Sequence, residues 1–291
     1  MRRARIGVAP IVVALVLAAC GAPGGSALQS TGDAPSADAG LSVRDELQVA
    51  MDATVATGRV RISQSLEISG SSALPSVSID EATVGQAAFG DERQMRMSAD
   101  LTALAGMGRI EMIRDGSLMY ARGAAFDELA GPGNWLLVDL DSDDPAVAPF
   151  APLASGQNDL TMAIFYLYGL VDEVSVEEGV TLADRPARVF SGEADLEAAR
   201  ETIPEARAES LEDLLANMRV TGVSPVIRAE AWVADDGLIH QVRYVYRIGD
   251  RLGGGTMTTV MQFSDHGEPM DLDLPDASEV VNIEDIDVGG G

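Results

Sequence analysis

The sequence predicts an α+β fold: one large curled antiparallel sheet, a half-barrel, with helices packed over its concave apolar face. Several segments alternate between apolar and polar residues, which is typical of strands with one buried face. Short connections containing Asp-Gly join consecutive segments, so neighbouring strands should be antiparallel. Other segments repeat apolar residues every three or four positions, as amphipathic helices do. Long strands must twist and curl, and the helices should cover the apolar face that results.

The first 19 residues have the pattern of an export signal. Arg2, Arg3 and Arg5 form a basic head, and an apolar run extends from Ile6 to Ala19. This run is shorter than the roughly 20 residues that a helix needs to cross a bilayer. It fits the hydrophobic region of a signal peptide. A short membrane anchor or a buried helix is the alternative.

Cys20 is the only cysteine, and it follows Leu17-Ala18-Ala19 directly. This stretch resembles a bacterial lipobox, in which a peptidase cuts before the cysteine and the thiol carries a diacylglycerol. Each buried methylene contributes about 0.8 kcal/mol, and two or more chains hold a protein on a membrane stably. An ordinary signal peptide that happens to contain a cysteine is the alternative. We expect a lipoprotein anchored at the extracytoplasmic face of the cell membrane.

The next segment is composed mainly of Gly, Ala, Ser, Pro and Asp, without apolar periodicity. Such a composition predicts a flexible tether with an r.m.s. length of roughly 25 Å. We therefore divide the chain into a signal peptide (1–19), a lipidated cysteine with its tether (20–40), a single domain (41–283) and a disordered tail (284–291).

The charge is strongly negative, with 46 acidic and 20 basic residues and a net charge of −26. Removal of the signal would take away three arginines and no acid, leaving 17 basic against 46 acidic residues, or −29. Such a surface repels nucleic acid and anionic head groups, so no nucleic-acid partner is expected. Solubility explains the charge better than a specific cationic partner does. Every basic residue is arginine, which suggests a GC-rich genome such as an actinobacterial one.

The domain should begin with an amphipathic helix at 41–57, capped by Ser42 and ended by Gly58. Strands are expected to follow at 59–68, at 95–101, on either side of a turn within 108–122, and at 134–140.

Residues 158–171 break the strand alternation and form the most apolar segment after the signal. Their spacing predicts a helix that is deeply buried or lines an apolar space. A strand is expected at 185–196, and helical pieces at 195–220, interrupted near Pro204. Two strands should flank Asp236-Gly237 within 226–248, with Leu238 and His240 on the apolar face, before a third at 253–263.

Catalytic and metal-binding patterns are lacking. His240 and His266 are the only histidines, and the sequence places them in a strand and a turn. The acidic run 139–144 has carboxylates at calcium-loop spacing, but Asp144 and Phe150 stand where an EF-hand needs Gly and Glu. We therefore expect that the protein is not an enzyme and that it binds neither a metal nor a cofactor.

Methionine recurs at apolar strand and helix positions. It suits adaptable apolar surfaces and also fills gaps in ordinary cores, so both interpretations stay open. These positions are Met95, Met97, Met112, Met119, Met162, Met257 and Met261.

Segments 134–140, 182–199, 231–244 and 271–281 resemble the actinobacterial LppX/LprG-like lipoproteins, whose fold is similar to LolA and LolB. The resemblance departs at 183–185, where the family pattern usually has a glycine. It implies a LolA-like fold with an apolar cavity between half-barrel and helices. Several members of the family carry triacylated glycolipids, and others have no established ligand.

We therefore expect a lipoprotein that binds or carries the acyl chains of a lipid or glycolipid. A lipid- or stress-sensing lipoprotein that regulates a membrane partner, and a structural surface lipoprotein without a ligand, are the alternatives. The sequence does not identify a protein partner. The residues expected to line the cavity are Val60, Ile62, Leu66, Met97, Leu101, Leu160, Ile164, Leu167, Tyr244 and Phe263.

Overall fold

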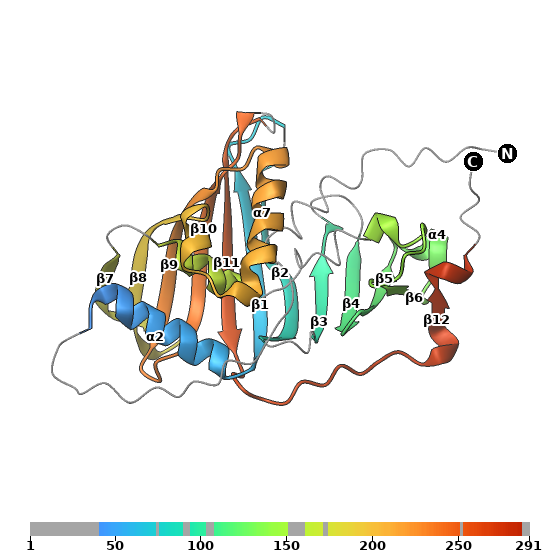
Figure 1. The fold of residues 1–291 in the computed structure, drawn as a ribbon, viewed down its shortest axis with the longest axis horizontal. Coiled ribbons are helices and arrows are strands. Elements are labelled where there is room, and N and C mark those ends of the chain that lie inside the picture. The colour runs from blue at the N-terminus through green and yellow to red at the C-terminus, as the bar shows by residue number, and fades with distance from the viewer. Residues whose placement is uncertain are drawn as a thin grey trace.

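The computed structural model describes residues 41–73, 76–89, 94–102, 108–150, 161–170, 174–250 and 253–286. Within these residues, twelve strands form one sheet in the order β12-β6-β5-β4-β3-β2-β1-β11-β10-β9-β8-β7 (Figure 1). The strands are β1 (Arg59–Ser69), β2 (Val77–Ala88), β3 (Met95–Asp100), β4 (Arg109–Asp115), β5 (Leu118–Gly123), β6 (Trp135–Asp139), β7 (Ser175–Leu182), β8 (Arg185–Asp195), β9 (Val226–Ala234), β10 (Ile239–Arg247), β11 (Thr256–Ser264) and β12 (Val280–Asn282).

The sheet consists of two meanders, β1 to β6 and β7 to β11. Strands β1 and β11 pair in antiparallel register at the seam between them, with Ile62 opposite Phe263. The other neighbours are also antiparallel, except that β12 runs parallel to β6. The sheet is open, because β12 and β7 are its two edges. This arrangement and the helices confirm the predicted fold class.

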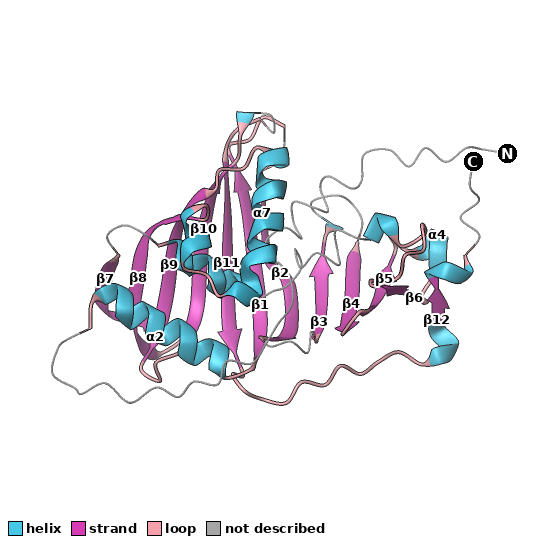
Figure 2. Cartoon of the chain, viewed as in Figure 1, coloured by secondary structure: helices cyan, strands magenta, loops and turns pink. Residues whose placement is uncertain are grey.

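The two long helices lie on the same side of the sheet (Figure 2). In the first of them, the Ser42 hydroxyl accepts a hydrogen bond from the Asp45 backbone N–H at 3.2 Å, which confirms the predicted cap. No helix of the described segments is long and apolar enough to cross a bilayer. The α-helices are α2 (Val43–Ala56), α4 (Asp127–Ala130), α6 (Met162–Phe165) and α7 (Ala208–Thr221), and the 3-10 turns are η1 (Ala148–Phe150), η2 (Tyr166–Gly169), η3 (Ala198–Glu201), η4 (Glu205–Arg207), η6 (Ala277–Glu279) and η7 (Ile283–Asp285).

Two predicted helices differ from what the structure shows. The segment expected to be helical at 158–171 forms only α6 and η2, and residues 151–160 and 171–173 lie outside the described residues. The predicted 195–220 helical region begins later, because Asp195 is the last residue of β8. Its interruption near Pro204 is confirmed, since η3, η4 and α7 form separate pieces there.

Strand β10 differs from its prediction at its first residues. The register shifts between Ile239 and Gln241, so Ile239 is fully buried while His240 is only partly buried. A β-bulge adds one residue to a strand and reverses which side chains face the core before it. The prediction that Leu238 and His240 share the apolar face was therefore wrong, although Val242, Tyr244 and Tyr246 do face inward.

A segment that we call the strap, residues 265–276, connects β11 to the distant β12 (Figure 1). Two arginines on the outer face of the sheet hold it. Arg61 forms an ion pair with Asp265 at 2.6 Å, and Arg96 donates a hydrogen bond to the Leu272 carbonyl at 3.0 Å. Because Met95 and Met97 on either side of Arg96 are buried, Arg96 and the strap lie on the opposite, outer face.

The turn between β7 and β8 predicts a stabilising substitution. Leu182 pairs with Arg185, and the two residues between them have positive φ angles, 47° at Ala183 and 65° at Asp184. An alanine in this left-handed region lowers the stability of the fold by about 1 kcal/mol, and a glycine at the same position avoids this loss. Ala183→Gly should raise the unfolding free energy by about 0.5 kcal/mol in urea titrations. Ala125→Gly, in a turn without positive φ, should lower it, and a loss of stability in both variants would contradict the prediction.

Candidate ligand-binding interior

The structure brings the predicted cavity residues together on the inner face of the sheet and the helical segment that covers it. Nine of the ten lie in the described residues, and none of the nine is more than 4% exposed. All nine belong to one buried apolar cluster, and Leu160 lies outside the described residues. That these residues line a ligand cavity remains a prediction. The nine are Val60, Ile62, Leu66, Met97, Leu101, Ile164, Leu167, Tyr244 and Phe263.

The inner face of β2 to β5 combines methionines with small residues. Met97 lies opposite Gly85 on β2 and opposite Met112 on β4, and Met112 in turn faces Ala121 on β5. Met97, Met112 and Ala121 are buried. Flexible thioether side chains between small residues can repack around apolar groups of different shape, which is the property that an adaptable binding surface needs.

The α6–η2 segment packs against the other half of the inner face. The rings of Tyr166 and Tyr244 make an edge-to-face contact with centroids 5.6 Å apart. The Tyr244 hydroxyl donates a hydrogen bond to the Ala163 carbonyl, which fixes α6 on β10. Burial raises the pKa of Tyr244 well above its ordinary value, so the phenol stays a neutral donor.

A small cavity of about 70 Å³ lies between α2 and residues 167–170. Its volume is well below the roughly 300–1,000 Å³ of ordinary ligand pockets. A polar group borders it, because the Gln48 side chain donates to the Tyr168 hydroxyl at 3.1 Å and that hydroxyl donates to Asp52 at 3.3 Å. Burial raises the pKa of Tyr168 to about 12. These contacts tie α2 to η2 over the interior.

An inward polar atom on β11 lacks a partner in the described part of the chain. The Thr259 hydroxyl on β11 is buried, between Leu66 and Tyr244 on the neighbouring strands. A buried hydroxyl without a hydrogen bond costs about 1–3 kcal/mol, and a polar group of a ligand could satisfy it. The alternation along 253–263 puts this threonine on the same face as Met257, Met261 and Phe263, but its neighbours on β1 and β10 depend on the strand register.

The two histidines meet, although the sequence placed them in separate elements. Their rings are 4.7 Å apart, and His240 Nε2 lies 2.8 Å from an Asp236 carboxylate oxygen. His266 Nε2 donates to the Ile239 carbonyl at 3.1 Å. Burial, together with the neighbouring His240, lowers the pKa of His266. The pair fastens the first residues of the strap to β10.

The acidic run 139–144 forms turns. Asp139 accepts a hydrogen bond from the Asp141 N–H at 3.2 Å, and Asp144 accepts one from the Ala146 N–H at 2.8 Å. The hydroxyl of Ser142 donates to Glu284 at 2.5 Å, which joins this loop to η7 at the start of the predicted tail. Among the described residues, no three His, Cys, Asp or Glu side chains are grouped to hold a metal ion.

Comparison with known proteins gives similar structures only. No protein-family model and no curated protein matches the chain. LprF from Mycobacterium bovis is 13% identical with a TM-score of 0.45, and covers 80% of this chain and 95% of its own. The lipoprotein LppX from Mycobacterium tuberculosis is 14% identical with a TM-score of 0.44, and covers 79% of this chain and 97% of its own. A LolA superfamily protein from Nitrosomonas europaea is 8% identical with a TM-score of 0.27, and covers 78% of this chain and 93% of its own. The solved structures to which the chain is similar thus include members of the group that its sequence resembles.

Proposed function

We propose that this chain is a membrane-anchored envelope lipoprotein whose apolar interior binds or carries the acyl chains of a lipid or glycolipid. The observation that carries the proposal is the inner face of β2 to β5, where the buried Met97 and Met112 lie side by side, flanked by Gly85 and Ala121. The proposal assigns binding and transfer to the protein, not catalysis. Cys20 would hold it at the extracytoplasmic face of the membrane, and residues 21–40 would let the domain 41–283 reach the bilayer.

The energetics favour reversible transfer. An acyl chain of about 15 methylenes costs on the order of 12 kcal/mol to place in water. A carrier needs only an interior as apolar as the membrane, because a much tighter site would retain the chain. The Thr259 hydroxyl would then receive a hydrogen bond from, or donate one to, the ester or hydroxyl end of a ligand.

The alternative of a structural lipoprotein also has an observation in its favour. The nine described candidates are all buried, and Tyr166 packs on Tyr244 with the geometry of an ordinary core. Native cores leave few voids larger than a water molecule, so a solid interior would bind nothing.

Ile164→Trp separates these two functions. Ile164 is fully buried on α6. In an interior that admits lipid, the indole should occupy ligand space and lower the lipid content while the melting temperature is kept. In a solid core, it should overpack and lower the unfolding free energy by roughly 1–3 kcal/mol.

The measurement is lipid mass spectrometry and a melting curve for full-length protein purified in mild detergent. Val49→Trp is the matched control, because Val49 on α2 is 56% exposed and should tolerate the same bulk. Absence of co-purified lipid from the parent, together with a destabilised Ile164→Trp, would overturn the carrier function.

A further inference from the structure

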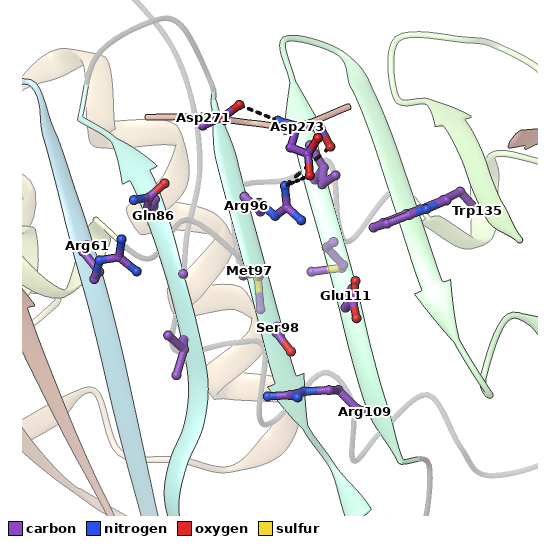
Figure 3. Close-up of a pocket in the computed structure, with 14 residues that line it drawn as sticks. Arg61, Gln86, Arg96, Met97, Ser98, Arg109, Glu111, Trp135, Asp271 and Asp273 are labelled. Atoms are coloured by element: carbon purple, nitrogen blue, oxygen red, sulfur yellow. Dashed lines mark hydrogen bonds and ion pairs between the residues drawn. The ribbon is translucent and has the colours of Figure 1, made fainter. Parts of the chain in front are cut away.

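A pocket of about 540 Å³ lies on the outer face of the sheet, next to the strap (Figure 3). Its walls come from β1 to β4, β6 and strap residues Asp271 and Asp273. Arg96 and Ser98 face this side, because side chains alternate along β3. Their neighbours Met95, Met97 and Ala99 are buried on the inner face. The volume falls within the range of small-molecule sites. The charged and polar groups of the pocket therefore lie on the face opposite the interior, although Gly85, Met97 and Met112 border the pocket as well as the interior, and its ligand need not be a lipid.

The charges on its walls are balanced. Three guanidinium groups line the pocket, and three carboxylates lie among them. Guanidinium groups only donate hydrogen bonds and carboxylates only accept them, whereas a hydroxyl does both. A ligand with a net charge would meet as many repelling as attracting groups. A neutral ligand with several hydroxyls can instead use donors and acceptors on every wall. The six charged side chains are Arg61, Arg96, Arg109, Glu111, Asp271 and Asp273.

Two features indicate groups that a ligand can engage. The Ser98 hydroxyl is buried at the pocket and has no hydrogen-bond partner in the described segments. Arg96 and Asp273 form an ion pair at 3.2 Å, but Asp273 is 75% exposed. Exposed ion pairs contribute little to stability, so either partner can exchange this contact for a ligand hydroxyl at small cost.

We propose that this pocket binds an uncharged carbohydrate, as a single sugar ring or a short oligosaccharide. Ser98 and the carboxylates of Glu111 and Asp273 would accept hydrogen bonds from sugar hydroxyls, and Arg96 and Arg109 would donate to them. Such contacts would attach the protein to a glycan on the face of the sheet opposite its helices.

The test is a glycan array probed with the full-length protein in mild detergent. The array carries uncharged hexose oligosaccharides, uronic-acid oligosaccharides and phosphorylated glycans. We expect retention of uncharged members only. Ser98→Ala removes a hydroxyl that makes no hydrogen bond to any described residue, so the fold should be kept while glycan binding weakens about three- to tenfold. Arg109→Ala should weaken it similarly.

Arg247→Ala, an exposed arginine on β10 that does not line the pocket, is the control and should leave binding unchanged. A second arm presents the same sugars as glycolipids in micelles. Binding of free and lipid-linked sugars that falls in Ser98→Ala supports the outer-face site. Absence of binding to uncharged sugars, preference for charged glycans, or binding that requires the lipid and persists in Ser98→Ala overturns the proposal. The last result would place the ligand in the interior instead, so this proposal and the carrier function can fail separately.

Discussion

Replacing Cys20 by alanine is expected to reduce the membrane-bound fraction of the protein by about tenfold or more. Cys20 is the only cysteine, and it follows the apolar run and Leu17-Ala18-Ala19. Two acyl chains hold a protein on a bilayer stably, whereas none of the described helices could replace them as an anchor. Cleavage before residue 20 should fail together with acylation, because the cysteine directs both in a lipobox.

Membrane fractionation and mass spectrometry of the amino terminus measure these two effects. Ser26→Ala in the tether is the control, and it should leave processing and fractionation unchanged. Parent protein that carries no lipid on its mature amino terminus, or a Cys20→Ala variant that is still cleaved before residue 20, would show that the lipobox interpretation is wrong.

Gly85→Ala is expected to lower the unfolding free energy by about 3 kcal/mol, the largest stability effect predicted for a single added methyl group here. Gly85 lies between Ile62 on β1 and Met97 on β3. A Cβ atom at this position would lie 2.5 Å from the Arg96 carbonyl oxygen and 3.0 Å from the Met97 Cβ. Backbone atoms of a paired strand cannot turn aside, so β2 and β3 would have to separate locally.

Gly116→Ala is the matched control for this experiment. Gly116 has a φ angle of 65°, and nothing lies within 4 Å of its added Cβ. Only backbone strain should act at this position, and it should lower the unfolding free energy by about 1 kcal/mol. Denaturant titration of both variants gives the comparison. Equal losses at the two positions would mean that the close approach of β2 and β3 does not matter for stability.

Most of the strands could be predicted because one of their faces is buried. In β1 and β11, buried and less buried residues alternate along the strand, which leaves a period of two in the sequence. Strand β7 escaped prediction because it is an edge strand with most of its residues exposed. Strands β2 and β12 were not predicted either. Strand β2 has no regular alternation, and its pairing with β1 contains a register shift, while β12 is only three residues long.

The residues of both candidate sites were predictable to different degrees. Apolar side chains such as Ile62 and Phe263 could be assigned to the interior, because facing follows from alternation. The residues of the outer-face pocket could not be assigned from the sequence, because the pocket depends on the course of the strap. Asp273 reaches Arg96 from 177 residues further along the chain, and no local pattern encodes that meeting. The contact between His240 and His266 was missed for the same reason.

The order of the strands has a consequence for how the chain folds. Each meander is made of neighbours in sequence, so each can form soon after its own residues are available. The seam is different, because β1 cannot complete its pairing until β11 has been made. In the same way, β6 cannot pair with β12 until the end of the chain is available. Until then, β1 presents an unpaired edge of eleven residues with one apolar face, which is the kind of surface that joins other chains. During export, when the amino-terminal meander emerges first, the protein is most exposed to aggregation before residues 256–282 have arrived.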